Sequence, residues 1–114
     1  MSDIKLSIIT VCLNSINTIE RCIKSVITQG YQNKELIIID GGSDDGTQAI
    51  IEKYAEYIDI YISEPDKGIG DAWNKGIKKS TGEIICFLNS DDYFSSDALN
   101  TAAVFFDELT KEGN

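Results

Sequence analysis

Hydrophobic and polar positions alternate along the chain in blocks that predict strands and helices in turn. Four short apolar runs, rich in β-branched or aromatic residues, lie at Leu6 to Val11, Leu36 to Ile39, Ile58 to Ile62 and Ile84 to Leu88. The first, second and fourth runs are almost continuously apolar, which is typical of strands that are buried on both faces. These runs predict the four strands of a parallel sheet.

The segment between the first two strands has the pattern of an amphipathic helix. Apolar residues recur at every third or fourth position from residue 19 to residue 27. Asn17 and Glu20 stand at the spacing of a capping box, and Gly30 is placed to end the helix. This helix is therefore expected to lie on the sheet.

Three further helices are expected near Thr47, from Asp71 to Lys79, and from Ser95 or Ser96 to an end at Gly113. Strands that alternate with helices of this length pair in parallel through right-handed crossovers. The order βαβαβαβα thus predicts an open doubly wound, mostly parallel α/β sheet, whose ligands bind outside the carboxyl ends of the strands, where the winding reverses. The residues expected to face the core are Ile19, Cys22, Ile23, Val26, Ile27, Ile50, Ile51, Tyr54, Ala55, Trp73, Ile77, Leu99, Ala102, Ala103 and Phe106.

The composition fits a single soluble domain, residues 1–114, with an acidic surface. The chain is 42% hydrophobic and carries 10 basic against 19 acidic side chains, a net charge of −9. This excess argues against a nucleic-acid partner, which needs clustered Lys and Arg. The absence of histidine removes the commonest general base and metal ligand. Three cysteines without CxxC spacing indicate neither disulfides nor zinc, and the lack of a signal peptide or transmembrane segment predicts a cytoplasmic protein.

Polar residues follow all four strands, at the edge where the site is expected. Asp91 and Asp92 come soon after the fourth strand, and neighbouring carboxylates repel each other unless a cation lies between them. A hard divalent ion, Mg²⁺ or Mn²⁺, suits such an all-oxygen site and is usually shared with substrate phosphates. A turn followed by a helix cap explains the same residues equally well, so both interpretations stay open.

The glycine-rich loops do not match common nucleotide or calcium motifs. No Gly-Lys-Ser/Thr follows Asp40, Ile51 stands where an EF-hand needs its last carboxylate, and Trp73 occupies the third glycine position of a dinucleotide motif. Asp40 ends a buried strand and is placed to accept a hydrogen bond from an N–H in the crevice. Lys67 has the charge to meet a diphosphate, although composition alone favours a solvent-exposed lysine.

Five motifs follow one another along residues 5 to about 100, namely LSIITVCLNS, ELIIIDGGSDDGT, SEPDKGIGDAWNKGI, TGEIICFLNSDD and SSDAL. Together they resemble the nucleotide-sugar-binding half of the family 2 glycosyltransferases with the GT-A fold. The third motif is similar to that of a bacterial subgroup that builds surface polysaccharides. The resemblance implies an inverting, metal-dependent transfer of a sugar from a UDP or GDP sugar to a polysaccharide or lipid-linked acceptor.

The resemblance also assigns roles to matching positions. It places the stretch from Thr10 to Asn14 beside the nucleotide base and makes Asp40 the acceptor for the ring N–H of that base. Mn²⁺ or Mg²⁺, bridging the diphosphate, is assigned to Asp92, with Asp91 as the alternative ligand and otherwise directed toward the ribose. The implied donor-binding residues are Thr10, Val11, Leu13, Asn14, Asp40, Lys67, Asp71 and Asp91.

The sequence departs from the family pattern in three respects. Asn89 replaces the acid that often begins the DXD-type metal motif, and Leu13 stands where an aromatic residue is common. The acceptor half and the catalytic base of the family lie far beyond the acidic motif, whereas this sequence ends at Asn114. We assign no catalytic base, because later acids such as Asp97 and Asp107 fall on or near a predicted helix.

Two hypotheses of different classes stay open. The chain is the donor-binding part of an enzyme, or it is a non-catalytic nucleotide-sugar-binding or protein-interaction module of the same fold. A receiver domain is disfavoured because Leu13 and Asn14 occupy the place of its paired acids, and a nucleotidyltransferase because no Arg-containing glycine loop follows the first strand. A homodimer and peripheral association with the inner face of the membrane are compatible with the sequence.

Overall fold

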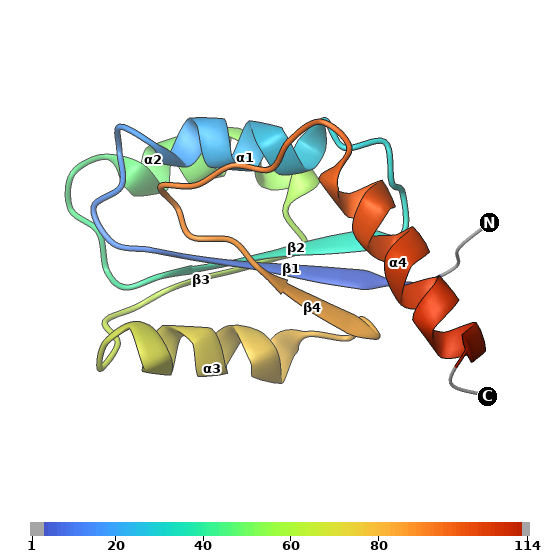
Figure 1. Ribbon diagram of the computed structural model, residues 1–114. Helices are drawn as coiled ribbons and strands as arrows, with labels where there is room; N and C mark the ends of the chain where they lie inside the picture. Colours follow the sequence, from blue (N-terminus) through green and yellow to red (C-terminus); the bar gives the residue numbers. More distant parts are fainter. Residues whose placement is uncertain (1–3, 113–114) are drawn as a thin grey trace.

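A central parallel sheet with helices on both faces forms the structure, a computed structural model that describes residues 4–112 (Figure 1). The sheet order is β3-β2-β1-β4, and every neighbouring pair is parallel. The strands are β1 (Leu6–Cys12), β2 (Lys34–Asp40), β3 (Ile60–Ser63) and β4 (Ile84–Phe87). The helices are α1 (Ile19–Ile27), α2 (Thr47–Lys53), the 3₁₀ turn η1 (Ala55–Tyr57), α3 (Ile69–Lys79) and α4 (Ala98–Glu112).

The helices divide between the two faces of the sheet. Figure 1 shows α1 and α2 on one face and α3 on the opposite face. The chain moves outward from β1 through β2 to β3, and α3 then carries it back to β4 on the other side of β1. The winding therefore reverses between β1 and β4, which confirms the predicted open doubly wound α/β sheet.

Each face of the sheet has its own apolar core, as the continuous apolar runs predict. On the α1 side Ile8 and Ile38 pack against residues of α1 and α4. On the α3 side Ile9 and Ile37 pack against Ala72. Successive residues of a strand point to opposite faces, so β1 and β2 need apolar side chains at nearly every position.

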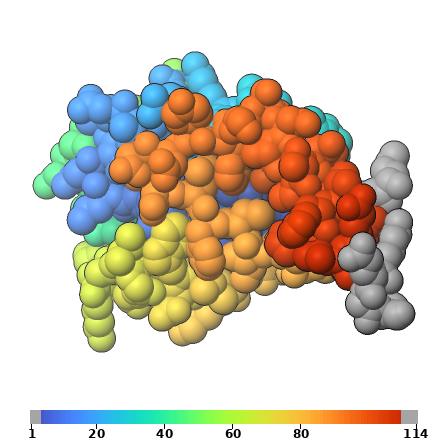
Figure 2. Space-filling view, viewed as in Figure 1, coloured from blue at the N-terminus to red at the C-terminus, as the bar shows by residue number. Residues whose placement is uncertain are grey.

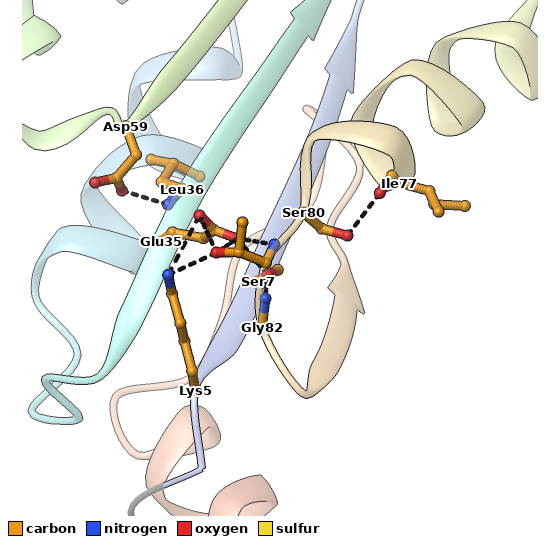
Figure 3. A network of polar contacts seen from close by, with 9 residues as sticks. Lys5, Ser7, Glu35, Leu36, Asp59, Ile77, Ser80 and Gly82 are labelled. Atoms are coloured by element: carbon orange, nitrogen blue, oxygen red, sulfur yellow. Dashed lines mark hydrogen bonds and ion pairs between the residues drawn. The ribbon is translucent and has the colours of Figure 1, made fainter.

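The amino end of the sheet is closed by a buried carboxylate, that of Glu35 (Figure 3). Its oxygens accept hydrogen bonds from the Ser7 hydroxyl (2.5 Å) and the Thr81 amide (2.7 Å), and Lys5 Nζ lies 3.7 Å away. Burial raises the pKa of Glu35, but the hydrogen bonds and the lysine charge outweigh it and hold the pKa below its ordinary value. This cluster joins β1 and β2 to the turn before β4.

Several local predictions are wrong because tertiary contacts override them. The capping box does not form: Thr18 precedes α1 without a side-chain cap, and the Glu20 carboxylate instead accepts hydrogen bonds from Lys53 and Tyr54 of the α2 region. Ala55 is exposed, because the chain tightens into η1 after α2.

Corrections also apply to α3 and α4. Ile77 is 40% exposed, since Ala72 and Gly76 form the buried face of α3. A Cβ on Gly76 would lie 2.4 Å from Ile9 Cγ2, so glycine lets the helix approach the sheet. Helix α4 begins at Ala98, later than predicted, and the expected stop at Gly113 lies outside the described residues. Within residues 4–112, no helix is both long and apolar enough to cross a membrane.

Candidate functional site

A cleft of about 610 Å³ opens at the carboxyl edge of the sheet, beside the point where the winding reverses. Its walls come from the end of β1 and the loop that follows, from the residues between β3 and the first turns of α3, and from the segment after β4. Of the predicted donor-binding residues, the structure places Val11, Leu13, Asn14 and Asp91 together in this lining. The cleft thus lies where ligands of doubly wound sheets bind.

The wall formed by the loop after β1 is fixed by the loop after β2. Asn14 adopts a left-handed conformation (φ 51°), and its side-chain oxygen accepts a hydrogen bond from the Asp44 amide (2.9 Å). The Asn14 amide in turn donates to the Ser43 hydroxyl (2.8 Å). Leu13, the residue before Asn14, is 58% exposed and offers an apolar surface to the cleft.

Asp40 lies at the end of β2, with no exposed surface and a full set of hydrogen bonds. Its carboxylate accepts hydrogen bonds from the Ser43 amide (3.0 Å) and hydroxyl, the Ser63 hydroxyl (2.7 Å), the Gln48 amide (3.2 Å) and the Cys12 thiol (3.5 Å). Burial raises the pKa of Asp40, but these donors outweigh it and lower the pKa below 3.8. Asp40 therefore ties together the ends of β1, β2 and β3, and its contact with a base stays a prediction.

Asp91 and Asp92 differ from Asp40 in both burial and pairing. Both are exposed, and neither carboxylate has a hydrogen bond or ion pair with the described residues. The Asp92 amide donates to the Asn89 carbonyl (2.9 Å), which closes a tight turn around Asp91. Asp91 lines the cleft, whereas Asp92 does not.

The remaining predicted residues lie outside the lining of the cleft. Thr10 is buried beneath it and contacts the Cys22 sulfur (3.9 Å). Asp71 accepts a hydrogen bond from the Lys67 amide (3.0 Å) at the start of α3, while the Lys67 side chain is exposed. The hydrogen bond from Lys67, with the positive charges of Lys75 and Lys67, lowers the pKa of Asp71.

Several residues of the cleft lining are absent from the predicted donor-binding set, and the acidic one among them is Asp66. Its side chain lies against Gly41, where an added Cβ would come within 2.8 Å of the carboxylate, and it accepts a hydrogen bond from the Gly68 amide (3.1 Å). The signal available in the sequence was an acid between the end of the third apolar run and Gly68, at the edge of the sheet where ligands bind.

The chemistry of the side chains at the cleft shows whether they could bind a divalent metal ion. Within residues 4–112 there is no cluster of three or more acidic, cysteine or histidine side chains that could hold an ion alone. Mg²⁺ and Mn²⁺ often take only one or two carboxylates together with substrate phosphates. Asp91 in the cleft lining and Asp92 next to it in the chain are exposed and have no partner among the described residues, so they offer the two carboxylates that such a site needs.

Comparison with known proteins agrees with this geometry. The chain is 31% identical over 101 residues to glycosyltransferase GlyA of Streptococcus pneumoniae, which covers 87% of this chain and 14% of GlyA. It is 34% identical over 105 residues to TuaG of Bacillus subtilis, a putative teichuronic acid biosynthesis glycosyltransferase, which covers 90% of this chain and 42% of TuaG. The chain therefore spans less than half the length of these relatives.

Solved structures show the same fold. The crystal structure of Staphylococcus aureus TarS residues 1–349 in complex with UDP-GlcNAc matches 91% of this chain and 31% of that one, with a TM-score of 0.83 and 31% identity. The mannosyltransferase PcManGT from Pyrobaculum calidifontis, in complex with GDP-Man and Mn²⁺, matches 90% of this chain and 34% of its own, with a TM-score of 0.79 and 23% identity. The sequence profile named Glycosyl transferase family 2 matches residues 7–113, and this chain belongs to that family.

Proposed function

We propose that this chain binds the donor in a glycosyltransferase that moves a sugar from a nucleoside diphosphate to a polysaccharide or lipid-linked acceptor with inversion. The observation that carries the proposal is the cleft at the reversal point, with the unpaired carboxylate of Asp91 in its lining. A UDP sugar is the favoured donor, because TarS at 31% identity was solved with UDP-GlcNAc, whereas the neighbour with GDP-Man is 23% identical. TuaG, named for teichuronic acid biosynthesis, supports a polysaccharide acceptor.

Metal dependence is part of the proposal and rests on Asp92, with Asp91 as the alternative ligand. A divalent ion bound there would neutralise charge on the departing nucleoside diphosphate. The chain has a net charge of −9, so its own side chains supply little positive charge for a diphosphate. The carboxylates of Asp91 and Asp92 repel a diphosphate by themselves, and we therefore expect donor binding to need the ion.

The other cleft residues orient the donor in this proposal. Leu13 and Val11 provide apolar surface against which a base can pack, and Asn14 holds that wall in place through Ser43 and Asp44. Burial of apolar surface contributes about 25 cal/mol per Å², so this wall supplies affinity but little choice among bases. No catalytic base is assigned, since the later acids lie on or beside α4 rather than in the cleft lining.

Calorimetric titration with UDP, GDP, dTDP and CMP sugars, with and without Mn²⁺, tests this function. We expect one nucleotide class to bind, Mn²⁺ to strengthen binding at least tenfold, and Asp92→Ala to abolish that gain. Asp97→Ala is the matched control, because Asp97 is exposed on the same segment and does not line the cleft. Absence of binding by every nucleotide would overturn the donor site, and equal binding without Mn²⁺ would overturn the metal dependence.

Turnover separates the enzyme from a binding module of the same fold. Release of UDP from the donor, measured in the longest natural chain that contains this segment, is expected in the presence of a saccharide acceptor. Intact donor binding without release of UDP would favour the non-catalytic module.

We also propose a cytoplasmic location at the membrane surface. Fractionation of cells tests this location: we expect the chain to be recovered with the membrane fraction and to be released by salt.

A further inference from the structure

The segment that carries Asp91 and Asp92 has no helix or strand of its own between β4 and α4. It runs alongside α1, as the orange trace in Figure 1 shows, and forms the middle of the surface seen in Figure 2. Irregular segments at a surface are usually held by few contacts and open easily. An acidic pair on such a segment needs another element to fix its position.

Helix α1 and the residues that follow it supply that element through three polar side chains. The Cys22 thiol donates to the Asn89 carbonyl (3.6 Å), and the Ser25 hydroxyl accepts from the Phe94 amide (3.0 Å). Gln29, which is 4% exposed, donates to the Ser95 carbonyl (2.6 Å) and accepts from the Leu99 amide (3.0 Å). Cys22 and Ser25 share one face of α1 because they are three positions apart, and Gln29 follows the end of the helix, two residues after Ile27.

These contacts enclose the acidic pair from both sides. Before it, Asn89 is held by Cys22, and the Ser90 hydroxyl lies 2.8 Å from the Ser15 hydroxyl. After it, the Tyr93 ring lies under the Arg21 guanidinium, 4.3 Å from the ring centre. The backbone around Asp91 and Asp92 is therefore fixed, while their carboxylates are left without partners among the described residues.

Gln29 also caps the start of α4. The first amides of a helix have no partner within that helix, and side-chain oxygens commonly satisfy them. Here the acceptor for Leu99, the second residue of α4, is Gln29, which follows the C-cap of α1. The same amide group binds Ser95, so α4 and the segment before it are held at one buried point just after the end of α1.

We propose that Ser25 and Gln29 are positioning residues, which set the place of the Asp91 and Asp92 carboxylates relative to the cleft. They touch neither carboxylate and act through the backbone that follows the pair. This inference rests on the proposed function, because it gives the pair its role as metal ligands. Loss of either anchor frees the backbone after Asp92, so the two carboxylates spread over more positions and the metal-dependent part of donor binding weakens.

Ser25→Ala tests the proposal, with Ser25→Thr as the conservative variant that keeps the hydroxyl. Thr28→Val is the matched control, since Thr28 is exposed at the end of α1 and its hydroxyl bonds only to Lys24 within the described residues. We expect Ser25→Ala to weaken UDP binding in Mn²⁺ about fivefold to tenfold, the size of one lost hydrogen bond. Binding without Mn²⁺ is expected to stay unchanged, and Ser25→Thr to restore the wild-type affinity.

Hydrogen exchange gives a readout that does not depend on a ligand. The Asp92 amide, which bonds to Asn89 rather than to α1, is expected to exchange at least fivefold faster in Ser25→Ala while amides of β1 keep their wild-type rates. Unchanged exchange at Asp92, or equal weakening of UDP binding with and without Mn²⁺, overturns the proposal.

If the wild-type chain binds no nucleotide, the proposed function fails and the exchange result alone decides the positioning role. If Ser25→Ala unfolds, Gln29→Glu, which keeps an acceptor for Leu99 and loses the donor to Ser95, takes its place in both measurements.

Discussion

At the amino end of the sheet, Glu35 is 6% exposed and accepts hydrogen bonds from Ser7 and Thr81, with Lys5 nearby. At the carboxyl end, Asp91 and Asp92 are exposed and have no partner among the described residues. The Glu35 carboxylate uses its oxygens as acceptors for groups of the protein, whereas the oxygens of Asp91 and Asp92 accept no hydrogen bond from the described residues. The acceptor capacity left over, rather than the charge itself, distinguishes a structural carboxylate from one that can bind a ligand.

Asp40 shows that location alone does not make this distinction. It lies at the carboxyl end, like the acidic pair, yet it resembles Glu35 because its oxygens accept hydrogen bonds from Ser43, Ser63 and Gln48. The comparison therefore separates Glu35 and Asp40, which stabilise the fold, from Asp91 and Asp92, which do not. The four substitutions below test this separation.

Glu35→Ala should have the largest effect on stability. It leaves the Ser7 hydroxyl and the Thr81 amide without their acceptor, and we expect a loss of about 3 kcal/mol in the free energy of unfolding. Urea denaturation measures it, with the exposed Glu52→Ala as control. A loss below about 1 kcal/mol would show that the cluster at the amino end contributes no more than surface charges do.

Gly82→Ala attacks the same end of the sheet through its backbone. A Cβ there would lie 2.5 Å from the Ser7 hydroxyl and 2.8 Å from the Lys5 carbonyl, and the carbonyl belongs to the main chain and cannot rotate away. We expect a loss of about 2 kcal/mol, typical of overpacking. Gly70→Ala, where nothing lies within 4 Å, should be neutral or gain up to about 1 kcal/mol. Equal melting temperatures for the two variants would contradict the prediction.

Asp40→Asn should cost about 1 to 2 kcal/mol at neutral pH, because the new NH₂ group faces donors from Ser43, Ser63 and Gln48. The pKa of Asp40 is lowered in the folded chain, so its stabilisation is complete above the ordinary value of 3.8 and is lost as the pH falls through the lowered folded-state pKa. The gap between wild type and Asp40→Asn should therefore narrow in acid. Denaturation curves at pH 7 and at successive values below 3.8 measure this gap, and a constant gap would refute the assignment.

Asp91→Asn should have the smallest effect on stability, within about 0.5 kcal/mol, since the carboxylate has no partner to lose in the part of the chain that the structure describes. Its effect on Mn²⁺-dependent UDP binding should be larger than that of Asp40→Ser measured under conditions where both variants are fully folded. A clear loss of stability in Asp91→Asn would place this residue with Glu35 and erase the difference between the two ends.

The apolar pattern predicts the sheet and its winding because burial on both faces leaves a continuous run in β1 and β2. It also places Val11, Leu13, Asn14 and Asp91 in one cleft, since the carboxyl ends of parallel strands share an edge. The pattern could not show that Asp40 would be surrounded by donors, because Ser63 comes from a strand that pairs only after folding.

Side chains that bond across elements account for most of the other differences. Glu20 has the spacing of a capping box, but Lys53 and Tyr54 lie closer to its carboxylate in the folded chain. Gln29 reads as a polar residue near the end of a helix, and its partners Ser95 and Leu99 are 66 and 70 positions away. Local spacing carries no information on contacts at such separation.

The contacts made by Cys22 and Ser25, and by Gln29 just after the helix, make the length and phase of α1 part of the proposed site. A helix rises 1.5 Å and turns 100° per residue, so Cys22 and Ser25 are about 4.5 Å apart along the axis and lie on one face of α1. One residue inserted between Thr18 and Cys22 would turn the Cys22 and Ser25 side chains by about 100° and direct them away from the segment after β4, without altering a residue of the cleft lining. The number of residues in α1 therefore sets where the segment that carries Asp91 and Asp92 is attached relative to the cleft.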